Sequence, residues 1–194
     1  MRTADHPVVA ACPADVPVGR SAHFKVGATV IAVTAYGVLV SLSAGSLTAA
    51  ASSNLVFFVL LMLNTYFSVT YTESKYHVRC LSDEVFNVPL AALYLAFPWL
   101  TRETFWFYLA MSIFFSLAMM KYANWLTRIE AGYFLRRKIL ANGFGCVLCG
   151  VGAAVVLIIG ETTPGAWMGV LVFGYANVHT LWIDPLYRHA AAKR

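Results

Sequence analysis

Charged residues are scarce in this chain: 12% of its 194 residues are Asp, Glu, Lys or Arg, whereas 60% are hydrophobic. A soluble domain usually carries about 25% charged residues, so this composition cannot cover a surface that faces water. The sequence also lacks a phosphate-binding loop, a nucleotide fingerprint, a nucleophile elbow and a His-rich di-metal pattern. The basic residues do not gather on a soluble face, so the net charge of +5 does not predict nucleic-acid binding. These absences favour a protein that is solvated by lipid.

Six apolar stretches approach the roughly 20 residues that a helix needs to cross the hydrocarbon of a membrane. They are Val26–Leu47, Asn54–Tyr71, Val85–Leu100, Thr104–Ala123, Ile139–Gly160 and Gly165–Ile183. In lipid each must be helical, because no water is there to satisfy its backbone hydrogen bonds. The third stretch is short and contains Pro89 and Pro98, so we expect a broken or tilted helix there. The sequence therefore predicts an all-α, polytopic transmembrane bundle with six spans.

The positions of the basic residues predict the orientation of this bundle. They lie before the first span, between the second and third, between the fourth and fifth, and after the sixth, while Arg102 falls on the other side. Because basic residues are retained in the cytoplasm, both termini are predicted to be cytoplasmic, in an inner or cytoplasmic membrane. Residues 1–25 are expected to form a mobile cytoplasmic tail, residues 26–183 the six-helix membrane domain, and residues 184–194 a short basic cytoplasmic tail.

A run of three basic residues, Arg136, Arg137 and Lys138, lies between the fourth and fifth spans. Basic residues beside a membrane attract anionic lipid head groups. We therefore expect this run to help set the orientation and to contact anionic lipid.

Small residues recur at four-residue spacing on the last two spans. Gly145, Cys149 and Ala153 do so on the fifth, and Gly165 and Gly169 on the sixth. Such spacing lets helix backbones approach closely. It predicts that the fifth and sixth spans pack on each other, and the alternative is a homo-oligomer or a membrane complex that uses the same faces.

The fifth span also contains a Cys-x-x-Cys pattern, formed by Cys146 and Cys149. Such a pair can be a redox couple or half of a metal site, and residues three apart on a helix lie on neighbouring surface. Cysteine is also among the most commonly buried small residues. Packing is the preferred interpretation, a soft metal ion is the alternative, and the sequence identifies no cofactor.

The connection between the second and third spans concentrates titratable residues. They are Glu73, Lys75, His77, Arg79, Cys80, Asp83 and Glu84. A solvated connector would have this composition too, because acids near the start of a helix interact favourably with its N-terminus. The functional hypothesis is a cytoplasmic mouth that admits an ion or holds a lipid head group, with His77, Arg79, Asp83 and Glu84 as its candidates.

Polar residues recur at helical spacing within the spans. They are Asn64 and Ser68 on the second span, Tyr108, Ser112 and Ser116 on the fourth, and Asn177 and His179 near the end of the sixth. Polar groups at this depth normally face the interior of a bundle, where they bond to a neighbouring helix or line a path. If the stripes converge, Asn64, Ser68, Asn177 and His179 line a narrow hydrophilic path.

The leading functional hypothesis is passage of a small solute or ion through the bundle, because almost all of the chain lies in the predicted spans and polar residues form stripes within them. One alternative is a membrane enzyme that acts on a lipid or quinone at the cytoplasmic face. Another is a non-catalytic subunit or assembly factor of a membrane complex. The sequence does not choose between an enzyme and a non-enzyme, although it leans toward the second.

Overall fold

All six apolar stretches are helical in the computed structural model of the chain, which describes residues 20–75, 81–127, 132–160 and 163–183. The helices are α1 (Arg20–Ser43), α2 (Ala49–Lys75), α3 (Leu81–Leu100), α4 (Thr104–Leu126), α5 (Gly132–Ile159) and α6 (Thr163–Val178), and α6 continues into the short π-helical segment η1 (His179–Ile183). The predicted all-α fold is therefore confirmed. For the third stretch, where a broken or tilted helix was expected, the structure has one continuous helix, α3, that contains Pro89 and Pro98.

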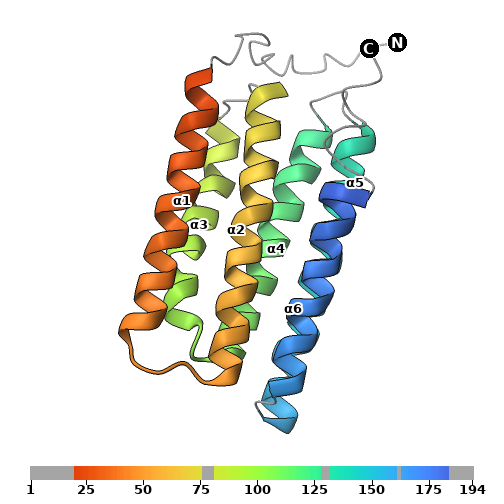
Figure 1. Ribbon diagram of the computed structural model, residues 1–194. Helices are drawn as coiled ribbons and strands as arrows, with labels where there is room; N and C mark the ends of the chain where they lie inside the picture. The colour runs from red at the N-terminus through yellow and green to blue at the C-terminus, as the bar shows by residue number, and fades with distance from the viewer. Residues whose placement is uncertain (1–19, 76–80, 128–131, 161–162, 184–194) are drawn as a thin grey trace, which may run out of the picture.

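Consecutive helices run in opposite directions, so α1 begins and η1 ends at the same end of the bundle (Figure 1). Lys25 of α1 and Arg136 of α5 lie near this end, which we call the basic end. The turns after α1 and α3 lie at the opposite end. This arrangement agrees with an even number of membrane crossings, while the orientation of the bundle in the membrane stays a prediction.

Five helical stretches are long and apolar enough to cross a membrane, and α3 adds a shorter apolar stretch. The five are Phe24–Ser43, Ala49–Thr72, Thr104–Leu126, Gly132–Ile159 and Thr163–Ile183. Apolar side chains also lie on the outside of the bundle, where Ile31, Ile158 and Leu171 are 69%, 81% and 64% exposed. Such a surface is suited to lipid, so by helix length and hydropathy the chain is a multi-pass membrane protein. The sixth crossing, through α3, stays a prediction.

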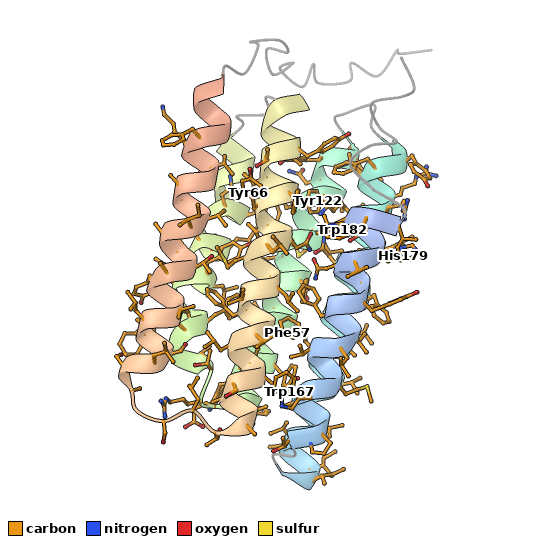
Figure 2. The ribbon with its side chains drawn as sticks, in the orientation of Figure 1. Phe57, Tyr66, Tyr122, Trp167, His179 and Trp182 are labelled. Atoms are coloured by element: carbon orange, nitrogen blue, oxygen red, sulfur yellow. The ribbon has the colours of Figure 1, made fainter. Side chains whose placement is uncertain are left out.

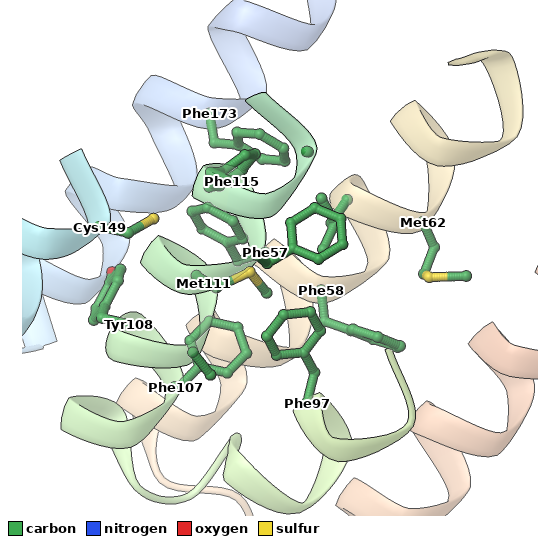
Figure 3. Packing of buried hydrophobic residues seen from close by; sticks show 14 of the residues in the cluster. Phe57, Phe58, Met62, Phe97, Phe107, Tyr108, Met111, Phe115, Cys149 and Phe173 are labelled. Atoms are coloured by element: carbon green, nitrogen blue, oxygen red, sulfur yellow. The ribbon is translucent and has the colours of Figure 1, made fainter. Parts of the chain in front are cut away.

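An aromatic core fills the bundle between its middle and its opposite end. Figure 3 shows the packing of its side chains from close by. The rings of Phe57 in α2 and Phe173 in α6 stack with their centroids 4.4 Å apart. Phe97 of α3 and Phe107 of α4 are fully buried, and their ring centroids are 6.0 Å apart. Aromatic pairs of this kind each contribute about 0.5–1.5 kcal/mol beyond the area that they bury. The core therefore joins α2, α3, α4 and α6 into one unit.

The last two helices pack mainly on other helices and only to a minor extent on each other: α5 lies along α4, and α6 lies along α2. Gly145 of α5 accommodates the ring of Phe115, and Gly169 of α6 accommodates the hydroxyl end of Tyr108. The prediction that the small-residue faces of spans five and six meet each other is therefore wrong. The absence of a Cβ at these positions makes room for aromatic rings of α4 instead of a second backbone.

Arg102 holds the turn after α1 at the opposite end. Its guanidinium donates hydrogen bonds to the backbone carbonyls of Gly45 (2.7 Å), Ser41 (3.3 Å) and Ser46 (3.3 Å). Gly45 has a φ of +102°, which a residue with a side chain rarely adopts. Carbonyls at the end of a helix lack hydrogen-bond partners within that helix. Arg102, the one basic residue on the other side of the predicted spans, supplies donors to carbonyls at and after the end of α1.

A second set of hydrogen bonds ties α2 to the turn between α3 and α4. The Asn54 Nδ2 atom donates to the Thr101 carbonyl and to Thr104 Oγ1, both at 3.0 Å. Thr101 Oγ1 in turn donates to the Pro98 carbonyl at 2.8 Å. Because Asn54 and Thr101 are almost completely buried, these bonds are shielded from water and fix the helices at the opposite end.

Candidate functional site

A polar cavity of about 180 Å³ lies between α2, α3, α4 and α5, in the half of the bundle toward the basic end. Figure 2 shows this division along the axis, with Tyr122 in the upper half of the view and Phe57 of the aromatic core in the lower half. The polar residues of the cavity wall are Asn64, Thr65, Ser68, Asn87, Tyr94, Lys121, Tyr122, Lys138 and Asn142. Leu61, Phe114 and Phe115 form the apolar part of the wall next to the aromatic core.

Lys121 enters the cavity wall from α4. Its Nζ atom donates a hydrogen bond of 2.7 Å to Asn87 Oδ1 of α3. The same Nζ lies 5.1 Å from the centroid of the Trp125 ring, which is within the range of a cation–π contact. Hydrogen bonds from an ammonium group are stronger than those between neutral groups, so this bond fixes the lysine and links α3 to α4.

Lys138 enters the wall from α5 and is only 6% exposed. Its Nζ atom lies 5.9 Å from the centroid of the Tyr122 ring. The three residues of the predicted lipid-contacting run therefore have different surroundings. Arg136 is exposed, Arg137 lies against the ring of Tyr133, and Lys138 faces inward. Ionisable residues within membrane helices are costly and usually mark a functional interior, so Lys138 belongs to the cavity and not to the lipid-facing surface.

Two pairs of hydroxyl groups connect α2 to its neighbours across this wall. Thr65 Oγ1 lies 2.6 Å from the hydroxyl of Tyr94 in α3, and Ser68 Oγ lies 2.9 Å from the hydroxyl of Tyr122 in α4. The threonine also donates to the Leu61 carbonyl at 2.8 Å. Positions 64, 65 and 68 fall on one side of α2 because a helix repeats every 3.6 residues. The polar stripe of the second span thus forms one wall of the cavity.

A second cavity of about 60 Å³ adjoins the first and is bordered by α6 as well. Asn64, Phe115, Lys138 and Asn142 line both cavities. Asn177 lines only the smaller one and is 5% exposed. Its Nδ2 atom donates to the Phe173 carbonyl at 2.9 Å, whereas its Oδ1 atom has no hydrogen-bond partner among the described residues. A buried hydrogen-bond acceptor therefore lies on a residue of the smaller cavity wall.

Three of the predicted path residues, Asn64, Ser68 and Asn177, line the two cavities. His179 does not: it is half-buried at the start of η1, with its ring centroid 6.2 Å from that of Tyr175. Glu84 is exposed near the start of α3 and also lies outside both cavities.

The other candidates from the connection between the second and third spans cannot be placed. His77 and Arg79 lie outside the described residues, as does the side chain of Asp83. The proposed role of this connection as a mouth therefore stays a prediction.

The polar stripe of the fourth span faces α5 and not the cavity. Ser116 Oγ lies 3.0 Å from Cys146 Sγ, and Ser112 Oγ donates to the Cys146 carbonyl at 3.0 Å. The Tyr108 hydroxyl donates to the Ala166 carbonyl of α6 at 3.3 Å. The helical phase of α4 therefore directs Ser112 and Ser116 toward α5 and Tyr108 toward α6, so these residues do not line the cavity with Asn64 and Ser68.

Cys146 and Cys149 are both free thiols at the contact between α4 and α5. Cys149 is fully buried and belongs to the hydrophobic core, and the Cys146 thiol forms a hydrogen bond with the Ser116 hydroxyl. Within the described part of the chain, no group of three or more His, Cys, Asp or Glu residues is arranged to hold a metal ion. The structure therefore gives the two cysteines packing partners.

Nothing in the sequence pattern points to Asn87. Lys121 is one of the basic residues between the fourth and fifth spans that predict orientation, and Lys138 is predicted to set orientation and to contact anionic lipid. Lys121 lies within the apolar stretch Thr104–Ala123, and an ionisable residue inside a membrane helix is itself a sign of a functional site. That signal identifies Lys121 from the sequence. Lys138 lies just before a predicted span, where a snorkelling surface lysine would also lie, so only the structure separates the two cases.

The chain matches no protein-family model, no curated protein and no solved structure. Its chemistry must therefore be inferred from the cavity alone. Ammonium, amide and hydroxyl groups line the two cavities, and among the described residues no His, Cys, Asp or Glu side chain does so. Such a wall can hold a ligand by charge and hydrogen bonds.

Proposed function

We propose that the protein carries a small solute or ion across an inner or cytoplasmic membrane, with the polar cavity as its binding site. One observation supports this proposal above the others: four helices place polar side chains around about 180 Å³ of space inside a bundle that exposes many large apolar side chains on its outside. Polar groups are expensive at membrane depth and are usually retained for a substrate pathway. Ligand sites in helical bundles commonly lie between helices in this way.

The position of the cavity favours a carrier over an open pore. Polar groups surround the cavity in the half toward the basic end, whereas the stacked rings of Phe57 and Phe173 fill the interior beyond it. The hydrogen bonds of Arg102 and Asn54 hold the helices together at the opposite end. A solute that leaves by that end must therefore wait for the aromatic core to rearrange, as in alternating access between two packings.

Uptake into sealed vesicles tests the proposed function. The purified protein would be reconstituted, and a panel of radiolabelled small solutes of negative, neutral and positive charge would be offered from outside. We expect saturable uptake of at least one class, which Asn64→Leu lowers at least about tenfold because Asn64 borders both cavities. Arg136→Gln is the control, since Arg136 is exposed near the basic end and its loss should leave uptake unchanged.

One result of this uptake experiment would contradict the proposed function. If folded wild-type protein takes up none of the panel above protein-free vesicles, carriage of a solute is the wrong function. Turnover of a lipid or quinone in the same vesicles would then favour the enzyme hypothesis, and a co-purifying membrane protein would favour a subunit.

A further inference from the structure

An apolar groove of about 230 Å³ separates the last turns of α5 from the first turns of α6, and Tyr108 of α4 forms its floor. Among the described residues that line the groove none is charged, and Tyr108 is the one that carries a hydroxyl group. We propose that this groove binds one acyl chain of a membrane phospholipid. The inference goes beyond the proposed function and does not depend on it, because the groove shares no lining residue with the polar cavity.

The floor of the groove is a tyrosine of α4 that fits against a glycine on each of the other two helices. A Cβ at position 152 of α5 would lie 3.3 Å from a ring atom of Tyr108, and one at position 169 of α6 would lie 2.5 Å from its hydroxyl oxygen. The same hydroxyl donates to the Ala166 carbonyl at 3.3 Å. The Tyr108 ring therefore occupies space in which α5 and α6 would otherwise meet, and these two helices make only minor contact with each other.

The groove is continuous with the lipid-facing surface of the bundle. Val151, Val155 and Met168 line it and are also exposed on the outside. All three belong to stretches that are long and apolar enough to cross a membrane. Acyl chains are the medium around such stretches, so the open side of the groove faces its ligand at high concentration. This continuity favours a phospholipid chain over an occupant that has to be supplied from elsewhere.

The size and the chemistry of the wall also suit a hydrocarbon chain. An engineered apolar cavity of about 150 Å³ binds benzene, so a groove of about 230 Å³ has room for several methylene groups. In a membrane the hydrophobic effect does not favour the groove over the bilayer, because lipid tails are as apolar as the wall. The gain comes from close contact with fixed side chains, since a void forfeits these contacts. We therefore expect a lipid that stays bound in mild detergent.

Native mass spectrometry tests this inference with the full chain. The protein would be moved from nanodiscs of dioleoylphosphatidylcholine into a mild detergent, washed free of loose lipid, and weighed with whatever lipid it retains. We expect the wild type to retain phosphatidylcholine. Glycerophosphocholine, which has the same head group and no acyl chain, should not bind at the same concentration. Binding of glycerophosphocholine as strong as that of the phospholipid would show that the chain is not what the protein holds, and would overturn the inference.

Variants that fill the groove place the bound chain. Val155→Trp and Gly165→Leu add bulk from α5 and from α6, and each should lower the retained lipid at least about fivefold, because the new side chain takes the space of the acyl chain. Leu157→Trp is the matched control, since Leu157 is exposed on α5 and lies outside the groove, and it should retain lipid as the wild type does. Melting curves identify any variant that does not fold. Retention that is equal in the wild type and in both folded groove variants, or that falls equally in Leu157→Trp, would overturn the inference.

The masses also identify other occupants of the groove. A dimer of the chain that Val155→Trp and Gly165→Leu both abolish would mean that a second copy covers the groove, and would overturn the acyl-chain site. A co-purifying quinone or other isoprenoid that phosphatidylcholine does not displace would overturn it as well. Phosphatidylcholine, phosphatidylethanolamine and phosphatidylglycerol should be retained within about threefold of one another, because no charged residue among the described ones lines the groove to select a head group. Retention of one head group alone would contradict recognition through the chain.

Discussion

At the scale of single residues, buried asparagine amides have opposite effects on stability in the two halves of the bundle. Asn54 and Asn177 are 1% and 5% exposed. The Asn54 Nδ2 atom donates two hydrogen bonds, whereas the Asn177 Oδ1 atom accepts none among the described residues. A buried polar atom without a partner costs about 1–3 kcal/mol. Asn54 therefore stabilises the fold, while the unpartnered oxygen of Asn177, a residue beside the smaller cavity, lowers stability.

Changing Asn177 to Leu should therefore raise thermal stability and impair function. The substitution removes the unpartnered oxygen, so we expect the free energy of unfolding to rise by about 1–3 kcal/mol. Binding or uptake should fall, as is common when a functional site is optimised for stability. Asn54→Leu is the matched control and should lower stability by a similar amount, because the Thr101 carbonyl loses its donor. Melting curves in detergent that moved in the same direction for both variants would contradict this assignment.

The cysteine pair yields a second prediction at this scale. If Cys146 and Cys149 only pack between α4 and α5, the double change to Ala should cost about 1–3 kcal/mol of stability and leave solute uptake within about threefold of the wild type. Vesicle uptake and metal analysis of the purified protein check this expectation. A normally folded double variant that is inactive, or that has lost a co-purifying metal, would give the cysteines a functional role.

At the scale of elements, the contact between α4 and α5 depends on where glycine is placed. A Cβ at position 145 would lie 3.0 Å from three ring atoms of Phe115, whereas one at position 143 would meet only the Met119 sulfur at 3.4 Å. A buried ring has little freedom to move, while a methionine side chain adapts easily. Two glycines on the same helix are thus predicted to respond differently to the same substitution.

Gly143→Ala should stabilise the protein and Gly145→Ala should destabilise it. Alanine is favoured over glycine within a helix by about 0.8–1.0 kcal/mol, and the Met119 side chain can yield to the added methyl group. At Gly145 the clash with Phe115 should outweigh that gain and cost about 1–3 kcal/mol net. Thermal unfolding of the two variants beside the wild type measures the difference. Stabilisation by both would mean that α5 does not lie against Phe115 as described.

The helices themselves could be predicted from the sequence, but their partners could not. Length and hydropathy predict all six helices, because lipid forces an apolar stretch to be helical, and five of them are long and apolar enough to cross a membrane. The spacing of Gly145, Cys149 and Ala153 correctly marks a face of close packing, since Cys149 and Ala153 are buried. It does not tell which helix packs there, because a missing Cβ accommodates a ring as well as a backbone. The choice of α4 over α6 depends on the ring of Phe115, far away in sequence.

At the scale of the whole molecule, polar and aromatic side chains divide the interior of the bundle between its two ends. The sequence predicted Asn64, Ser68 and Asn177 as polar groups of the interior, and they line its cavities. It assigned Lys121 to orientation and Lys138 to orientation and lipid contact, because counting charges ignores helical phase. Lys138 and Arg136 are two positions apart, which places them on nearly opposite sides of α5, and only one of them faces the cavity.

The predicted orientation is tested with reporters. A fluorescent protein fused after Arg194 should be active in the cytoplasm, and a phosphatase inserted near Pro164 should be active outside. The basic residues that motivate this prediction lie almost entirely on one side of the spans. Phosphatase activity from a fusion at the C-terminus would overturn both the six-span count and the orientation.

The central claim, that the polar cavity binds a small solute and passes it across the membrane, is tested most directly by uptake into sealed vesicles. Vesicles with the wild-type protein would be offered the solute of the charge panel that gives the strongest saturable uptake. We predict uptake that Asn64→Leu lowers at least about tenfold and Arg136→Gln preserves, because Asn64 borders both cavities and Arg136 is exposed. No wild-type uptake above protein-free vesicles, or equal uptake by the wild type and Asn64→Leu, would contradict the claim.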